Sequence, residues 1–347
     1  MSVVGTRPEL IQAAPVSRAL AGRCREILLH TGQHYSVGLS AALVEELQVR
    51  VDRWLDVGSG SHADQTARTV LGVERAIAAE RPDVMLVRGD TNSTLGAALA
   101  ASKALVPIVH TEAGARSFDR TMPEEINRLV VDRLASVLCC SSEQGVANLA
   151  AEGITQGVSV TGDVTVDAVR VNTPTEPDAV AIAAGLGLTR VAFALATLHR
   201  AANTDDPARL RGILTGLGRV GVPVVLALHP RTAEAMAREG VAAPPSVRVV
   251  EPLAYRTTLA LLRLARVLLT DSGGLQKEAY VLGTPCVTLR DSTEWGETVT
   301  AGWNRLAGAD PERIAALARD FVPPQSRSPL YGDGHAAARI ADAALAA

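Results

Sequence analysis

Short apolar runs alternate with longer Ala/Leu-rich stretches along all 347 residues, and this alternation constrains the fold more than any other feature. Parallel strands that are buried on both faces read as continuous apolar runs, and the stretches between them have the pattern of crossover helices. The runs lie at 27–29, 84–87, 108–109, 137–139 and 158–160 in the first half, and at 191–195, 224–227, 247–250, 267–269 and 286–289 in the second. The sequence therefore predicts an α/β protein with two doubly wound, Rossmann-like domains.

The length of the chain exceeds the usual size of a single core and also indicates two domains. Residues 172–177 are polar and broken by proline, which is typical of a linker. We predict an N-terminal domain over 1–171 and a C-terminal domain over 172–325. A second break at 322–326 precedes a helical pattern at 336–346, so we expect segment 326–347 to pack back onto the first domain. Two facing sheets would leave a cleft, toward which polar residues at strand ends would point.

Composition excludes several classes of partner. Lys and Arg number 34 against 37 Asp and Glu, and a net charge of −3 gives no broad attraction to nucleic acid or to an anionic membrane. No apolar stretch has the length of a bilayer span, and the N-terminus lacks the pattern of a secretion signal, so we expect a cytoplasmic protein. Four cysteines lie in or beside apolar segments without metal-type spacing, which predicts reduced, packed thiols: Cys24, Cys139, Cys140 and Cys286.

The sequence Ser272-Gly273-Gly274 has the form of an anion-binding turn, since it joins the apolar run 267–271 to a helical pattern at 275–282. Two glycines allow close approach of the backbone, and a helix that begins there directs free N–H groups at a ligand such as a phosphate. Glu278, one turn into the helix, could accept hydrogen bonds from sugar hydroxyls beyond that phosphate. The alternative is an ordinary glycine turn between a strand and a helix.

A second turn of this kind opens the chain. Residues 3–9 form an apolar stub, a glycine turn and the start of a helical pattern, with Arg7 at its entrance. Two phosphate-competent turns indicate two nucleotide-type domains.

Two carboxylates follow neighbouring predicted strands. Asp90 ends the run 86–89, and Glu112 ends the run 108–111. Both would face one crevice, because the carboxyl ends of parallel strands meet at the same edge of a sheet. Asp90 could alternatively cap a helix beginning near Thr94, whereas glutamate is a poor N-cap.

A third acid is suggested by the helix start at 122–128. Pro123 fits the first helical position, and acids in the first turn complement the helix dipole. This account does not explain why three charged residues crowd the preceding loop, namely Arg116, Asp119 and Arg120. We therefore treat Glu124 as a possible third acid, with Arg128 as its expected ion-pair partner. Clustered carboxylates shift one another's pKa values and can supply both an acid and a base.

Histidines follow predicted strands in the second domain. His199 and Arg200 come after the run 191–195 and offer a proton donor beside a fixed cation, which suits a diphosphate. His229 repeats the arrangement after the next run, and we expect it to form a wall of the site. In the first domain His34 belongs to a polar cluster at 33–35, which could face substrate or anchor a loop.

Taken in order, these motifs resemble those of the non-hydrolysing UDP-N-acetylglucosamine 2-epimerases, whose fold is similar to that of the B-type glycosyltransferases. The resemblance covers nearly the whole chain and rests on residues 5–9, 31–36, 89–94, 112–114, 123–128, 199–200, 271–278 and 293–295.

The resemblance implies inversion at C2 of UDP-N-acetylglucosamine to give UDP-N-acetylmannosamine, through loss of the C2 proton, elimination of UDP and re-addition. It implies no cofactor or metal and a homodimer. It assigns the acid and base roles to Asp90, Glu112 and Glu124 without saying which residue takes which proton. His199 would contact the departing phosphate, and Glu278 would bind ribose. The diphosphate and the rest of the substrate would be bound by Arg7, Arg128, Arg200, Ser272, Gly273 and Gly274.

The chain departs from the family pattern at three positions. Gln12 stands where a lysine is usual, Ala202 where a glutamate is usual, and Thr258 where a phenylalanine near the base is common. These changes predict reduced or retuned activity and put uracil stacking in doubt. Residues 34–36 and 229–231 are similar to those of members without a regulatory site, so we expect no allosteric activation by UDP-N-acetylglucosamine.

Four other functions stay open at this point. An epimerase for a modified 2-acetamido nucleotide sugar would use the same residues, and a hydrolysing 2-epimerase would release free UDP. A B-type glycosyltransferase would need an acceptor. A nucleotide-sugar sensor would bind without exchanging the C2 proton.

Overall fold

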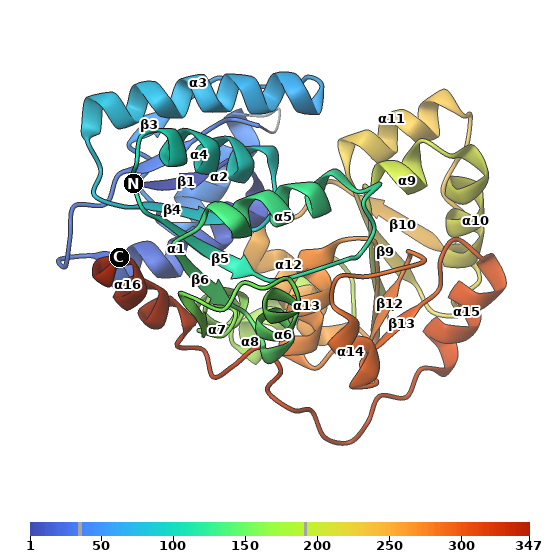
Figure 1. The fold of residues 1–347 in the computed structure, drawn as a ribbon. Helices are drawn as coiled ribbons and strands as arrows, with labels where there is room; N and C mark the ends of the chain where they lie inside the picture. Colours follow the sequence, from blue (N-terminus) through green and yellow to red (C-terminus); the bar gives the residue numbers. More distant parts are fainter. Residues whose placement is uncertain (34–36, 191–192) are drawn as a thin grey trace. The chain divides into compact units, whose positions relative to one another are not determined.

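The computed structural model describes residues 1–33, 37–190 and 193–347, with the backbone alone for 37–41. The chain forms two compact units, Met1–Arg170 with Tyr331–Ala347, and Val171–Leu330 (Figure 1). His34, Tyr35 and Ser36, which the sequence links to substrate or to regulation, lie outside the described residues.

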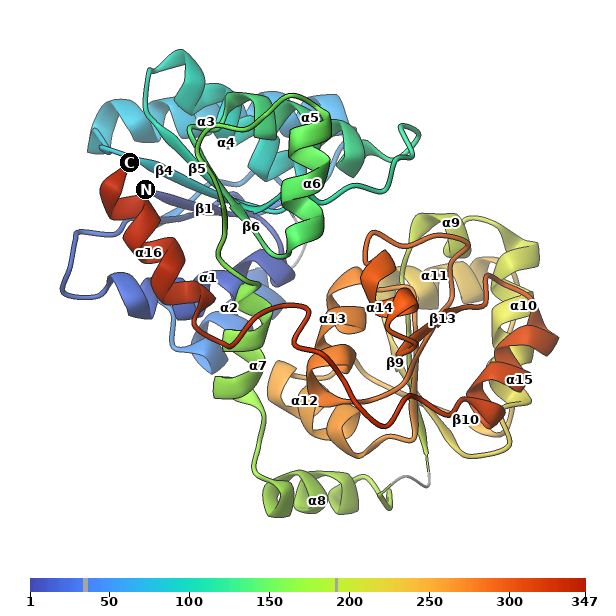
Figure 2. The same ribbon diagram turned by 60° about the horizontal axis from the view of Figure 1, so that its bottom comes forward.

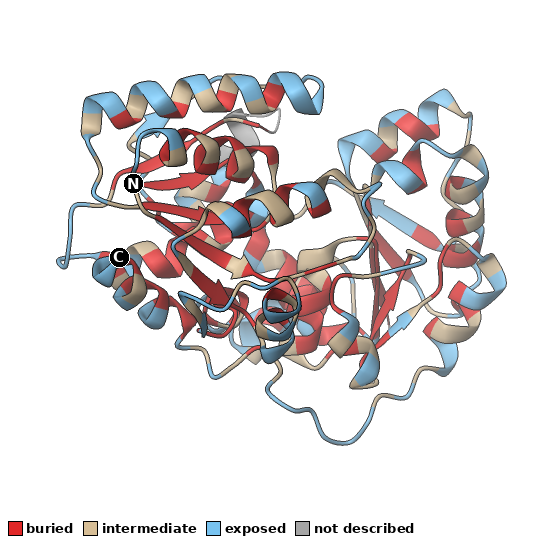
Figure 3. Cartoon of the chain, viewed as in Figure 1, coloured by how far each residue is buried: buried red, intermediate tan, exposed pale blue. Residues whose placement is uncertain are grey.

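The first unit contains a seven-stranded parallel sheet in the order β3-β2-β1-β4-β5-β6-β7. The central strands are buried throughout, which explains their continuous apolar sequences (Figure 3). The strands are β1 (Ser2–Val4), β2 (Leu28–His30), β3 (Arg53–Trp54), β4 (Met85–Arg88), β5 (Ile108–Ala113), β6 (Val137–Cys140) and β7 (Val158–Val160).

Helices cover both faces of this sheet. Val87 packs in a cluster with α3 (His62–Glu80), α4 (Asn92–Lys103) and α5 (Pro123–Leu134). Leu86 points the other way, into a cluster with α1 (Arg7–Leu20), α7 (Val164–Asn172) and α16 (Ala336–Ala346). The last helix lies beside α1, so the end of the chain returns to the unit in which it began (Figure 2). The unit also contains α2 (Val37–Leu47) and α6 (Glu143–Ala151).

The second unit repeats the plan with a six-stranded parallel sheet in the order β10-β9-β8-β11-β12-β13. Its strands are β8 (Ala194–Leu198), β9 (Val224–Leu228), β10 (Val247–Val250), β11 (Val267–Thr270), β12 (Cys286–Thr288) and β13 (Asn304–Leu306). One face is covered by α10 (Pro207–Gly218), α11 (Pro230–Arg238) and α15 (Pro311–Asp320). The other is covered by α8 (Glu176–Gly185), α12 (Tyr255–Leu264) and α13 (Gly273–Leu282). Two short helices, α9 (Ala201–Thr204) and α14 (Gly296–Thr300), complete the unit.

The structure confirms the prediction of two Rossmann-like sheets and shows where the apolar runs mislead. β3 and β13 lie at sheet edges, and both residues of β3 are exposed, so neither strand needs an apolar run. β8 begins at Ala194, later than the run at 191–195 suggests, and it ends directly before His199.

Each sheet has a switch point where the strand order reverses, between β1 and β4 in the first and between β8 and β11 in the second. Ligands of doubly wound sheets bind beyond the carboxyl ends of the strands at this point. Asp90 follows β4, and Asp271 with Ser272 follows β11. The fold therefore places the candidate residues of each unit at the edge where a ligand is expected.

Within the part of the chain that the structure describes, no helix combines the length and the apolar character needed to cross a bilayer. Cys139, Cys140 and Cys286 are buried free thiols, and burial raises the pKa of each to about 12. Cys24 is exposed, so the expectation of a packed thiol is wrong there, because the turn after α1 leaves it at the surface.

Candidate active site

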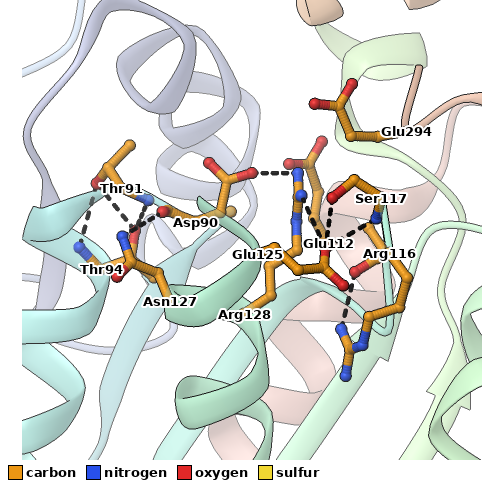
Figure 4. A network of polar contacts seen from close by, with 12 residues as sticks. Asp90, Thr91, Thr94, Glu112, Arg116, Ser117, Glu125, Asn127, Arg128 and Glu294 are labelled. Carbon is orange, nitrogen blue, oxygen red and sulfur yellow. Dashed lines mark hydrogen bonds and ion pairs between the residues drawn. The ribbon is translucent and has the colours of Figure 1, made fainter. Parts of the chain in front are cut away.

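Asp90 lies at the carboxyl end of β4 and is held by α5. Its carboxylate forms an ion pair with Arg128, and its backbone carbonyl accepts a hydrogen bond of 2.8 Å from the Asn127 side chain (Figure 4). Thr91 is the N-cap of α4, with its hydroxyl 3.2 Å from the backbone nitrogen of Thr94. The alternative role of Asp90 as a helix cap is therefore wrong. Its side chain is 21% exposed, so it can still reach a ligand.

Glu112 lies next to Asp90 at the end of β5. A Cβ atom on Gly89 would lie 3.3 Å from Oε2 of Glu112, so the carboxylate rests against the turn that carries Asp90. Gly89 has a φ of +60°, which glycine adopts without strain, whereas Glu112 adopts a φ of +63° despite its side chain. Strained backbone of this kind is typical of functional sites.

Gln12 of α1 donates a hydrogen bond of 2.8 Å to Oε1 of Glu112. The residue that departs from the family pattern is thus in direct contact with a candidate catalytic acid. An amide supplies a neutral donor where an ammonium group would supply a charge. We expect Gln12 to affect the site through this contact.

The first turn of α5 contains two glutamates with different surroundings. Glu125 is buried and accepts hydrogen bonds from the backbone nitrogens of Ser117, at 2.8 Å, and Phe118, at 3.2 Å, so it anchors the preceding loop (Figure 4). Glu124 is half-buried, and its role as a third acid stays a prediction. Arg128 contacts Asp90 and, at 3.9 Å, Glu125, and the expected pairing of Arg128 with Glu124 stays a prediction.

Glu9, to which the sequence assigned no role, links the two turns at the first switch point. Its Oε2 accepts hydrogen bonds from the backbone nitrogens of Gly5 and Thr6, at 2.6 and 2.8 Å. Its Oε1 accepts them from the hydroxyls of Thr91 and Thr94, at 2.7 and 2.9 Å. Burial raises the pKa of Glu9, and these hydrogen bonds oppose the rise. Arg7, two residues earlier, is exposed at the start of α1.

In the second unit, a buried carboxylate orients His199. Nδ1 of His199 lies 3.0 Å from Asp271, which also accepts hydrogen bonds from the backbone nitrogens of His199 and Arg200. Burial by itself would raise the pKa of Asp271, but His199 and the N–H donors outweigh it and lower the pKa to about 2. An ionised Asp271 accepts a hydrogen bond from Nδ1–H of His199 and so orients the ring.

The start of α13 has the features of an anion site. Ser272 caps the helix with its hydroxyl, 3.4 Å from the backbone nitrogen of Leu275. A Cβ on Gly273 would lie 3.2 Å from the indole nitrogen of Trp295 and 3.8 Å from the Arg200 guanidinium. A guanidinium group and a helix N-terminus thus meet at one place, and both attract a phosphate.

Other residues shape this edge of the second unit. The rings of His199 and His229 have centroids 5.5 Å apart, and the role of His229 as a wall of the site stays a prediction. The Lys277 ammonium lies 4.1 Å from the centre of the Trp295 ring, and Glu278 is buried. Glu294, which belongs to the motif at 293–295, forms an ion pair of 2.9 Å with Arg290, a contact that the sequence did not predict.

The pKa of Asp271 predicts a pH-dependent stability of the second unit. A carboxyl group with a pKa of about 2 when folded and about 4 when unfolded stabilises the fold fully above pH 4, by about 2 to 3 kcal/mol, and this contribution is lost as the pH falls toward 2. We expect D271N to lower the free energy of unfolding by at least that amount at pH 5 and by much less at pH 2. Urea unfolding followed by tryptophan fluorescence measures the difference. An equal difference at both pH values would contradict the prediction.

The fold and the two candidate sites together indicate a class of protein. Two parallel sheets, one with carboxylates side by side and one with a glycine-rich helix start at its switch point, are the features of a two-domain nucleotide-binding enzyme with Rossmann-like units.

Comparison with known proteins narrows the class. The family model for UDP-N-acetylglucosamine 2-epimerase matches residues 18–345, and the chain belongs to this family. It is 42% identical to the UDP-2,3-diacetamido-2,3-dideoxy-D-glucuronate 2-epimerase of Pseudomonas aeruginosa, over 99% of this chain and 98% of that protein. It is 38% identical to the UDP-N-acetylglucosamine 2-epimerase of Methanocaldococcus jannaschii, over 90% of this chain and 89% of that protein.

A crystal structure of the M. jannaschii enzyme in complex with UDP-GlcNAc and UDP is similar to this chain with a TM-score of 0.93. The match has 35% sequence identity and covers 100% of this chain and 99% of that one.

Proposed function

We propose that this chain interconverts the C2 epimers of a UDP-linked 2-acetamido sugar by elimination and re-addition of UDP, with UDP-N-acetylglucosamine as the reference substrate. The observation that carries the proposal is the placement of Asp90 and Glu112 side by side at the ends of β4 and β5. Inversion at C2 requires a base for one face of the sugar and an acid for the other, and two carboxylates at one edge can supply both.

The first unit would carry out the proton transfers. A carboxylate removes the C2 proton, the electrons of the C–H bond form the C1–C2 double bond, and the bond from C1 to the UDP oxygen breaks. The product is a 2-acetamidoglucal. In the return step UDP adds to C1, and a carboxylic acid delivers a proton to the opposite face of C2. The ion pair with Arg128 orients Asp90, and the hydrogen bond from Gln12 orients Glu112.

The second unit would hold the diphosphate while it is detached. His199, oriented by Asp271, and Arg200, at the start of α13, supply donors for the negative charge that develops on the leaving group. Retaining UDP is essential, because its loss to solvent would leave the glucal behind, and addition of water in place of UDP would make the overall reaction a hydrolysis. Ser272 and Glu278 are proposed to contact the diphosphate and the ribose.

The name of one relative favours a second candidate substrate for the same reaction. The relative with 42% identity acts, by its name, on a sugar with acetamido groups at C2 and C3 and a carboxylate in place of the hydroxymethyl group. Gln12, where the sequence comparison expects a lysine, donates a neutral hydrogen bond to Glu112, which is consistent with a substrate that differs from UDP-N-acetylglucosamine. A UDP-diacetamido uronate is therefore the alternative substrate of the same reaction.

The test is incubation of the protein with each nucleotide sugar in deuterated water, with NMR detection of deuterium at C2 and of the second epimer. We expect both signals for one of the two sugars, and the faster one is the substrate. Free UDP and N-acetylmannosamine would instead indicate a hydrolysing enzyme, and binding without label would indicate a sensor. Absence of label from both sugars would overturn the proposal.

A homodimer and a cytoplasmic location are also proposed, from the family resemblance and from the sequence. Light scattering of the purified protein tests the first, and fractionation of cells tests the second.

A further inference from the structure

His110 is a buried residue of β5 to which the proposed reaction assigns no role. Its side chain has no exposed surface, and both ring nitrogens have partners. Nδ1 lies 2.7 Å from Oδ1 of Asp132 on α5, and Nε2 lies 2.8 Å from the backbone carbonyl of Gly89. A carbonyl and an ionised carboxylate only accept hydrogen bonds, so both contacts are hydrogen bonds only when both ring nitrogens carry protons.

Asp132 is the second member of this buried pair. Burial would raise its pKa, but His110 and Arg116 outweigh this effect and lower the pKa, so the carboxylate is ionised. Its Oδ2 accepts from the Arg116 guanidinium, at 2.7 Å, and from the backbone nitrogen of Gly114, at 3.2 Å. Arg116 in turn binds Glu152, at 2.7 Å, which is 27% exposed. With His110 doubly protonated, two cations face two anions within this cluster.

These contacts reach both turns that carry the proposed catalytic acids. The Gly89 carbonyl belongs to the peptide bond that joins Gly89 to Asp90, and His110 fixes the plane of that peptide. The Gly114 nitrogen lies two residues after Glu112, whose backbone is in the strained left-handed region. His110 and Asp132 thus connect the Asp90 turn, the Glu112 turn and α5, which also carries Arg128.

We propose that His110 is a positioning residue for the epimerisation, and that with Asp132 it holds the Asp90 and Glu112 turns in register so that the two carboxylates face the two sides of C2. This inference rests on the proposed function. It extends that function to a residue that touches no substrate, and it explains why a charged pair occupies a place that apolar side chains could fill.

The test compares two amide variants with a control from the same strand. H110N keeps a donor near Asp132 but cannot reach the Gly89 carbonyl, and we expect kcat to fall about 10- to 100-fold with KM changed less than about threefold. H110Q can reach the carbonyl and should recover part of kcat. V109A removes buried methyl groups one residue away without touching either turn, and its kcat should equal that of the wild type. Equal kcat values for H110N and V109A, measured well below both melting temperatures, would overturn the inference.

A structural readout separates this inference from the proposed function. In ¹⁵N NMR spectra of the wild type near neutral pH, both ring nitrogens of His110 should carry protons. The amide signals of Asp90 and Gly114 should shift in H110N and stay in place in V109A. A neutral His110 ring, or unshifted amides, would overturn the inference whatever the activity. A wild type that labels no 2-acetamido nucleotide sugar would overturn the proposed function, while the NMR result would still decide the role of His110.

Discussion

Replacing Glu112 by Gln should lower kcat for epimerisation by about 10²- to 10⁴-fold, the range typical for loss of a general acid or base. Glutamine has the same length, and its carbonyl oxygen can still accept the hydrogen bond from Gln12. It cannot carry a proton to or from C2. KM and the melting temperature should therefore change little, and exchange of the C2 proton with deuterated water should fall in parallel with kcat.

The control for this variant is E74Q, the same chemical change on the exposed surface of α3 in the same unit. Its kcat should match that of the wild type. If E112Q retained kcat within about threefold of E74Q, Glu112 would not be a proton-transfer residue, and Asp90 with Glu124 would have to supply the acid and the base.

Replacing Gly274 by Val should weaken UDP binding about 10- to 100-fold without loss of stability. Among the described residues, no atom beyond its chain neighbours and its own helix backbone lies within 4 Å of the Cβ position of Gly274. The folded protein can thus accommodate the side chain. If a diphosphate occupies that space, the valine methyl groups displace it from the α13 N–H groups, at a cost of about 1.4 to 2.7 kcal/mol.

Isothermal titration with UDP measures the effect, and G185V serves as the control. Gly185 ends α8 of the same unit and also faces open space. G185V should bind UDP as the wild type does. Unchanged UDP affinity in G274V would show that the diphosphate does not lie at the start of α13.

The pattern of apolar runs was enough to predict the fold class, because strands buried on both faces must be apolar and crossover helices must separate parallel strands. It failed at β3 and β13, since edge strands bury too little surface to require such runs. The sequence predicts domain boundaries after residues 171 and 325, and the compact units of the structure divide after Arg170 and after Leu330.

Part of the candidate site could also be predicted from the sequence, because its residues follow the apolar runs that form the strands. Residues such as Asp90 and His199 directly follow strands, and their place at the carboxyl edge comes from local order along the chain. The assignment of individual roles stays a prediction that the variants above test.

The sequence by itself determined which residue types stand at the ends of which strands, because that information is local. Only the tertiary structure decided what those residues contact. Gln12 donates a hydrogen bond to Glu112, which is 100 positions away in the sequence, and Asp271 accepts one from the backbone nitrogen of Arg200, which is 71 positions away. Such contacts depend on strand order, on register and on the strained turn at Glu112, and these follow from packing the whole sheet rather than from any short segment.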